Sequence, residues 1–386
     1  MFGLFGIAQT SWMGRLPSIR ESLEISDGQL GTILVVAALG SLVGVLLVGA
    51  VTMRLGSAAT LRLSMFGSLA GFALMGVGAL LGAVAVFTAG LLLNGFATPG
   101  TNVPINLEAA RLEKRLGKSV LPHVHASFSV GALLGSGAAA LTSMLHIHAA
   151  WHIIGVIAVV TVGRALLINP GTELQDHPVR AVGATGRNPH RASTGGALKA
   201  WTEPRTLLIG LVILAATMSE GAAANWLNLA VVDSFATREA IGALAYGTFV
   251  VSMLVVRLLG SGLTERLGRV TLLRISGASA LGGLLIFGLA PSLPFAWVGI
   301  VLWGAGAAMA WPLGTAAAAD DPNRAASRVA VTNSFASMAS ITFPPVLGLL
   351  ADSWGIRNAL LLITAAMAVS IVVAGKARPE HEPLPG

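Results

Sequence analysis

Long apolar runs recur along nearly the whole chain, separated by short polar segments. Eleven of them are long enough to cross a bilayer, because a spanning helix needs about 20 predominantly apolar residues. The runs lie at residues 30–52, 60–82, 85–108, 120–145, 149–168, 206–232, 240–259, 270–290, 293–316, 328–350 and 356–375. The pattern therefore predicts an all-α membrane protein.

A further apolar stretch opens the chain at residues 1–14 and is shorter than a span. We expect it to be the outer half of a twelfth helix, with a start that is assigned too late or a chain that is truncated. The longest polar segment, residues 169–204, carries Pro, Gly, Thr, His and Arg without periodicity. It predicts a linker between a first half at 1–168 and a second half at 205–386, each of six helices, the second with a short tail.

The positions of Lys and Arg predict the orientation. If the chain begins inside, only Arg15, Arg20, Arg238 and Arg357 of the 24 Lys and Arg residues lie in outer loops. Arg164 and Arg257 are assigned to the inner ends of their helices. Because cytoplasmic loops carry an excess of Lys and Arg, the linker and both termini are expected in the cytoplasm.

Composition narrows the function. Charged residues make up 11% of the chain, against about 25% in soluble domains. The net charge of +7 follows from the loop cations, so no nucleic-acid partner is expected. The chain has no Cys, and its His-x-His at 123–125 lacks further metal ligands nearby. No P-loop, nucleophile elbow or hydrolase motif appears. The sequence predicts no enzyme, no metal and no cofactor.

The two halves resemble each other. HASFS at 125–129 matches TNSFA at 332–336, and LLNGFA at 92–97 matches VLWGAG at 301–306. Parallel repeats of this kind are one of the architectures of secondary transporters, in which the solute binds near the bilayer midplane.

A loop motif gives this architecture a family. GAVTMRLGS at 49–57 follows the second expected helix, SGLTERLGR at 261–269 follows the eighth, and a related GLLADSWGIR occupies 348–357. With the expected twelve helices and central linker, the chain resembles the major facilitator superfamily. The resemblance implies two six-helix halves, transport by alternating access, and a gating role for the matching residues Gly49, Arg54, Glu265, Arg266, Gly268 and Arg269. Met53 replaces the acid of the first copy.

Shorter motifs resemble the branch around fucose permease and uncharacterised bacterial relatives. They are Trp12-x-x-Arg15-x-Pro17, His125-x-x-Phe128-Ser129-x-Gly131 and Glu220-Gly221-x-x-x-Asn225-Trp226. Well-known members of that branch couple sugar uptake to proton entry. The resemblance implies proton-coupled transport of a small, sugar-like polar solute. Efflux of drug-like or apolar metabolites is an alternative, and a non-transporting membrane sensor is a third.

Glu220 is the first candidate for proton coupling. It is the only charged residue of the run at 206–232 and lies near its centre. A carboxylate at that depth is costly unless it faces a protein interior or a water-filled path. The alternative is a structural carboxylate bonded to a neighbouring helix. His125 and Glu108 are the second candidates for proton transfer; a structural imidazole and an interfacial acid near Arg111 are their alternatives.

Polar and aromatic residues at helical spacing are candidates for solute binding. Asn102 and Asn106 share a helix face with Asn94, and Pro104 between them frees a carbonyl. The other candidates are Ser129, Asn225, Trp226, Trp303, Trp311, Asn333 and Ser337. Interhelical hydrogen bonding and packing are the alternatives. Arg15 is expected at the outer mouth, as a solute-attracting or an interfacial, snorkelling side chain. The expected partners are a small-molecule solute, protons and the lipid bilayer of a bacterial inner membrane, around a monomer.

Overall fold

The structure of the protein is a computed structural model that describes residues 1–116, 121–172, 200–321 and 324–380. All regular structure in these residues is helical. Ten helices are long and apolar enough to cross a membrane. The predicted linker falls mostly outside the described residues. The division of the chain at 168 and 204 stays a prediction, because the residues cluster by contact into two compact units that do not coincide with the two halves.

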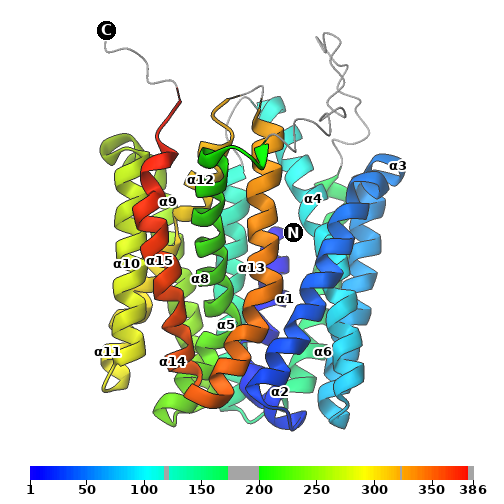
Figure 1. Ribbon diagram of the computed structural model, residues 1–386. Helices are drawn as coiled ribbons and strands as arrows, with labels where there is room; N and C mark the ends of the chain where they lie inside the picture. The colour runs from blue at the N-terminus through cyan, green and yellow to red at the C-terminus, as the bar shows by residue number, and fades with distance from the viewer. Residues whose placement is uncertain (117–120, 173–199, 322–323, 381–386) are drawn as a thin grey trace. The chain divides into compact units, whose positions relative to one another are not determined.

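The first unit comprises Met1–Arg180, Ala223–Val251 and Pro344–Ala359. Its helices from the first half of the chain are α1 (Phe2–Met13), α2 (Leu16–Ser22), α3 (Asp27–Leu81), α4 (Val84–Leu116), α5 (Leu121–Met144) and α6 (Ala149–Gly171). It also contains the end of α8 (Pro204–Phe235), the beginning of α9 (Glu239–Leu267), the end of α13 (Ala325–Trp354) and most of α14 (Ile356–Leu360). Helix α3 packs against α4 and α6, and α1 packs against α5 (Figure 1).

Helix α3 covers two of the predicted spans. The runs at 30–52 and 60–82 are two helical spans that meet at Gly56, where φ is 83° and the backbone is not helical. Only glycine adopts this conformation without a steric penalty, so Gly56 of the first loop motif supplies the turn between two spans. The capping box of Ser26 and Gln29 begins the helix.

Helix α1 is short and lies very close to α5. A Cβ atom on Gly131 would collide with the main-chain carbonyl of Gly3, and one on Gly6 would collide with the carbonyl of Phe128. The two glycines therefore permit a backbone-to-backbone approach of the kind that brings transmembrane helices together.

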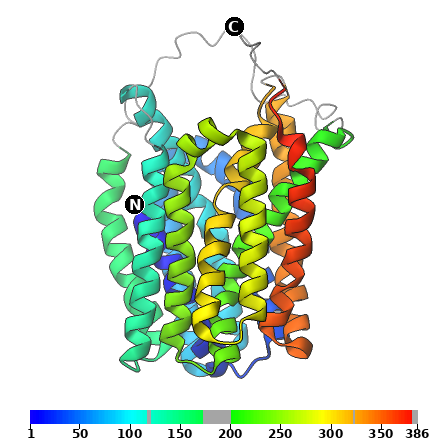
Figure 2. The same ribbon diagram turned by 90° about the vertical axis from the view of Figure 1, so that its left-hand side faces the viewer.

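The second unit comprises Ala181–Ala222, Ser252–Phe343 and Leu360–Gly386. It holds the beginning of α8, the end of α9, α10 (Arg269–Leu289), α11 (Leu293–Ala307), α12 (Ala310–Ala318), most of α13, α15 (Leu362–Val373) and the 3-10 turn η2 (Ala374–Ala377). Helix α10 packs against α11 and α15 (Figure 2).

The predicted run at 293–316 is not one continuous helix. α11 ends at Ala307 and α12 begins at Ala310. Pro312 has no N–H to donate to the carbonyl of Ala308, four residues before it, so the helical hydrogen-bond ladder is interrupted there. The break leaves the Ala308 carbonyl available to a neighbouring side chain.

Candidate functional site

Glu220 of α8 is paired with Arg257 of α9 inside the second unit. Arg257 donates its Nη2 to both carboxylate oxygens of Glu220, at 3.0 and 3.1 Å. Its Nε donates to the Ala308 carbonyl at 3.1 Å, so the broken helix holds the guanidinium. The side chains of Arg257 and Glu220 are 34% and 29% exposed. A charged pair near the middle of an apolar helix that is still one third exposed requires a polar surrounding, because lipid would reject it.

The pairing of Arg257 adds to the sequence interpretation. The sequence places Arg257 near the inner end of its helix and predicts no partner for it, and the structure pairs it with the carboxylate at the centre of α8. Two signals in the sequence could have found it. Arg257 is the only charged residue in the run at 240–259, and Pro312 frees the carbonyl that holds it. An isolated intramembrane acid calls for a cation of this kind.

Trp303 fixes the helix that carries Glu220. Its Nε1 donates to the hydroxyl of Ser219 at 2.8 Å, its ring packs against Phe287, and the side chain is fully buried. Trp303 therefore presents no exposed ring to a solute in this structure. Trp311 in α12 is 38% exposed. A solute-binding role for each stays a prediction.

The asparagines of α4 bond to each other. Asn106 donates its Nδ2 to the side-chain oxygen of Asn102 at 2.6 Å and to the Asn102 carbonyl at 2.9 Å. Asn94 is buried, and its Oδ1 has no hydrogen-bond partner among the described residues. An amide oxygen buried without a partner is costly, so Asn94 is the member of this group with an unused acceptor.

The remaining candidates for solute binding differ in exposure. Ser129 is buried in α5, Asn225 is half-buried and Trp226 is buried, with an Nε1 that finds no acceptor in the described part of the chain. In α13, Ser337 and Asn333 are exposed, and the Ser337 hydroxyl donates to the Asn333 carbonyl at 3.1 Å. Their roles stay predictions.

The second-choice proton residues belong to the first unit. His125 is exposed and meets the ring of Phe2 edge-on, with ring centres 5.3 Å apart. Glu108 is buried and forms an ion pair with Arg111, as expected, while its Oε2 has no partner among the described residues. In the described part of the chain, neither residue belongs to an ion pair in which both side chains are about one third exposed, as in the pair of Glu220 with Arg257.

The loop-motif residues differ in their contacts and in their exposure. Gly268, with φ of 74°, forms the turn between α9 and α10. Arg269 contacts Asp320 at 2.8 Å, and Asp320 also pairs with Arg205. Gly49, Arg54, Glu265 and Arg266 are exposed. Of the motif, Arg269 is thus the residue in the described structure that makes the charge contact expected of a gate.

Beside this contact, Glu203 bonds two arginines of the second unit. Arg328 donates its Nε to Glu203 at 2.8 Å, and Arg324 contacts the same carboxylate at 3.1 Å. Burial opposes it, but hydrogen bonds from Arg328 and Thr206 together with the charges of Arg328 and Arg324 lower the pKa of Glu203 below its ordinary value. Sequence reasoning missed this cluster.

A second charged cluster closes one end of the first unit. Arg15 contacts Glu239 at 2.8 Å, and Glu239 also accepts from the main chain and hydroxyl of Ser18, at 2.9 and 2.7 Å. Arg15 is 3% exposed, so the expected interfacial, snorkelling side chain is wrong. Its other bonds to the Thr142 hydroxyl and the Ile147 carbonyl hold it between α1, α5 and α9.

Arg20 and Asp352 extend this cluster. Arg20 contacts Asp27 of α3 at 2.5 Å and Asp233 of α8 at 2.7 Å. Burial opposes the shift, but the two carboxylates raise the pKa of Arg20 and keep it charged. Asp352 of α13 accepts from the hydroxyl of Ser26 and the amide of Gly28, at 3.0 and 3.1 Å. The cluster thus joins first-half helices to α8, α9 and α13.

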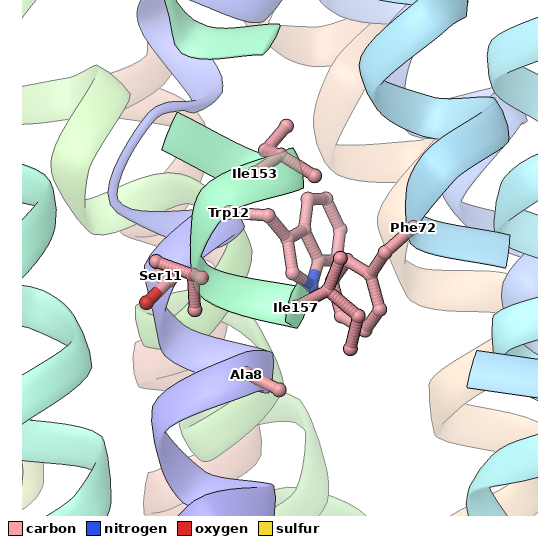
Figure 3. Close-up of a pocket in the computed structure, with 7 residues that line it drawn as sticks. Ala8, Ser11, Trp12, Phe72, Ile153 and Ile157 are labelled. Atoms are coloured by element: carbon pink, nitrogen blue, oxygen red, sulfur yellow. The ribbon is translucent and has the colours of Figure 1, made fainter. Parts of the chain in front are cut away.

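Two other features do not form a polar site. A narrow gap in the first unit, without room for a water molecule, is lined mainly by apolar residues, and Figure 3 shows the ring of Trp12 among Phe72, Ile153 and Ile157. Its lining offers a polar solute few partners. Within the described ranges, no group of three or more His, Asp or Glu side chains is arranged to hold a metal.

These features define a class: a multi-pass helical membrane protein with a charged pair inside its helices and charged clusters at their ends. The sequence profile of the Major Facilitator Superfamily matches residues 1–335 and, in a second match, 209–386. The chain belongs to this superfamily of transporters, which confirms the predicted all-α fold with twelve helices and the expectation that it is not an enzyme.

Several proteins resemble the chain over nearly its full length. The "Uncharacterized transporter y4wD" of Sinorhizobium fredii is 29% identical over 97% of this chain and 95% of its own. The structure of the nucleoside transporter NupG has a TM-score of 0.74 at 14% identity, covering 97% and 96% of the two chains. FucP in its outward conformation gives 0.65 at 15% identity, with the same coverage. These structures share the fold.

Proposed function

We propose that this protein is a proton-coupled secondary transporter of a small polar, sugar-like solute in a bacterial inner membrane, with both termini in the cytoplasm. The supporting observation is the Glu220–Arg257 pair, one third exposed near the middle of apolar helices. A carboxylate in this position can take up a proton, and protonation breaks its ion pair. Coupling follows if the solute's binding depends on which of the two states Glu220 is in.

The two charged clusters support alternating access. The Arg15–Glu239 and Arg20–Asp233 contacts join first-half helices to α8 and α9, so they have to separate when that end opens. By the predicted orientation this end is the outer one. The Arg269–Asp320 contact of the loop motif is the corresponding candidate at the inner end. Ion pairs that break and re-form can hold two conformations at similar free energies.

The same observation ranks the alternatives. An exposed ion pair suits a polar solute better than the apolar metabolite of an exporter, because an apolar group would desolvate the charges without pairing them. FucP is described as a fucose:proton symporter, which agrees with uptake of a sugar-like solute. A non-transporting sensor would have no need of a charged pair inside its helices.

The test is proton movement in liposomes containing the purified protein. We assay wild type, Glu220→Gln and the control Glu21→Gln with sugars, polyols and lipophilic cations under an imposed pH gradient. Glu21 is an exposed carboxylate without an ion pair among the described residues. We expect a solute-dependent proton signal that Glu220→Gln abolishes and Glu21→Gln keeps. A signal that survives in Glu220→Gln would move proton coupling to His125 or Glu108.

A further inference from the structure

We propose that Arg257 binds an anionic group of the solute, a carboxylate, and does so when Glu220 carries the proton. The inference rests on the proposed role of Glu220 as the proton site. It names a residue and a charge for the solute that neither the fold nor the loop motif supplies.

Only part of the guanidinium is engaged. Nε is bonded to the Ala308 carbonyl, and Nη2 alone serves both oxygens of Glu220. Nη1 has no hydrogen-bond partner among the residues that the structure describes. Guanidinium and carboxylate groups pair best through two parallel hydrogen bonds. Glu220 does not make that two-nitrogen pairing, which leaves a free donor on a side chain that is 34% exposed.

Protonation of Glu220 changes the charge of the site. The added proton forms an O–H bond on the carboxylate, which ends its ion pair and leaves Arg257 positive without a counter-charge. A charge left unpaired inside a membrane protein is strongly unfavourable. A carboxylate on the solute can replace it by accepting from Nη1 and Nη2 together, while the new Glu220 hydroxyl is free to donate to the same anion.

The described part of the second unit supplies no other counter-charge close to the pair. α11, α12 and α15 contain no charged residue, and those of α10, Arg269 and Arg274, lie in its first two turns. On α9 itself, Glu265 is exposed and lies about two helical turns beyond Arg257. Arg328 lies in the first turn of α13, where it pairs with Glu203 and Glu380. The carboxylate of Asp320 is already shared by Arg205 and Arg269. In the described part of the second unit, proton uptake at Glu220 therefore favours an anion brought in by the solute.

The proposed exchange sets the solute class and its electrical behaviour. One proton and one monoanion enter together, so the cycle carries no net charge. With the polar, sugar-like solute proposed above, the class becomes a small hydroxylated monocarboxylate, such as an aldonate or a uronate. The Ala308 carbonyl accepts from Arg257 Nε whether Glu220 is charged or protonated. The guanidinium therefore need not move when the carboxylate of the solute replaces that of Glu220.

The experiment pairs acids with their neutral counterparts. Gluconate and glucuronate are compared with glucose, and lactate with propane-1,2-diol, by calorimetric binding to the purified protein in buffers of different ionisation enthalpy, which counts protons taken up. Solute-driven proton movement is then measured in liposomes with and without a membrane potential. The variants are Arg257→Gln, Arg257→Lys and Glu220→Gln, with Arg274→Gln as the matched control for the loss of one exposed cation.

We expect an acid to bind wild type with uptake of a proton and its neutral counterpart to bind at least about tenfold more weakly, the value of one charge-assisted hydrogen bond. Arg257→Gln should lose this preference, Arg257→Lys should keep part of it, and Arg274→Gln should match wild type. Glu220→Gln should bind the acid without proton uptake. Transport should not respond to membrane potential.

Two results overturn the inference in distinguishable ways. If neutral sugars drive proton movement through wild type while no acid binds better than its neutral counterpart, the anion site is wrong and the proposed transporter stands. If no solute of either kind drives proton movement, the anion site and the proton-coupled function both fail. Thermal unfolding of each variant shows whether a lost signal comes from a misfolded protein.

Discussion

Asn228 of α8 donates its side-chain amide to the main-chain carbonyl of Gly14 at 2.7 Å, at the loop where α1 ends. The bond lies in the first unit, where Ala139, Ala140, Ala240 and Ala243 of α5 and α9 also form a buried cluster. It joins the first half of the chain to α8 without using a charge. Two neutral contacts thus accompany the ion pairs of Arg15 and Arg20 at the same end.

Weakening this end should shift the protein towards a state in which the end is open. Glu239→Gln removes the counter-charge of the buried Arg15, and a buried ion pair that loses one partner is destabilised by about 3–5 kcal/mol. The chain has no Cys, so a single Ala140→Cys substitution in the buried cluster gives a unique site. We expect thiol labelling of Cys at this position to be faster with Glu239→Gln. Equal rates in both backgrounds would mean that Glu239 does not hold this end closed.

Pro312→Ala should extend α11 into α12. The new N–H can donate to the Ala308 carbonyl and compete with Arg257 for it, while the helix gains up to about 3 kcal/mol from the loss of an interior proline. We expect a higher midpoint of thermal unfolding together with weaker solute-driven proton movement. Both are measured on one preparation. Raised stability with unchanged proton movement would show that Arg257 does not depend on the broken helix.

Gly131→Ala should destabilise the contact of α1 with α5, because its Cβ would meet the main-chain carbonyl of Gly3. Main chain cannot move aside as a side-chain tip does, and overpacking of this kind costs about 1–3 kcal/mol. Gly137→Ala is the matched control in the same helix, since its Cβ meets nothing within 4 Å. We expect thermal unfolding in detergent to shift downwards for Gly131→Ala alone. A shift of equal size in both would trace the effect to helix propensity.

Protonation of Glu203 should lower the free energy of unfolding at acid pH. Its folded-state pKa lies below the ordinary value of 4.5, so its contribution is complete above that value and is lost as the pH falls through the lowered pKa. The carboxylate is 18% exposed, so the contribution is at most about 1 kcal/mol. The difference in unfolding midpoint between wild type and Glu203→Gln should shrink below pH 4.5. A difference that stays constant down to about pH 3, roughly 1.5 units below the ordinary value of 4.5, would exclude this titration as its source.

The apolar pattern predicts the helices well because bilayer thickness sets their length. It misses the break between α11 and α12, since hydropathy stays high through Pro312 and only the missing N–H marks the interruption. It separates residues 30–52 and 60–82 correctly, because the chain turns at Gly56 between them. The missed break at Pro312 concerns a single backbone position that a hydropathy average does not resolve.

The candidate site is predicted in part. The sequence identifies Glu220 as a candidate site residue because it is the only charge in its apolar run. The free-energy cost of a lone charge in the membrane can be recognised from that one helix. Its partner lies in another helix, and Arg257 could equally be a loop-facing cation until the depth of each helix is known. Ser18 and Glu239 are separated by 221 positions, and nothing in either neighbourhood names the other. Such contacts depend on helix packing, which the sequence pattern leaves open.

Arg20 has a consequence for the rate at which its end can open. It is shared between Asp233 of α8 and Asp27, which begins α3 beside it. In the proposed opening, Asp233 would withdraw while Asp27 stays in contact, so the guanidinium would keep one carboxylate partner. The separation would then cost one of two ion pairs in water, much less than leaving the guanidinium with no counter-charge. The same arrangement would hold Arg20 in place until Asp233 returns, so that closing would not have to wait for a long side chain to find its position.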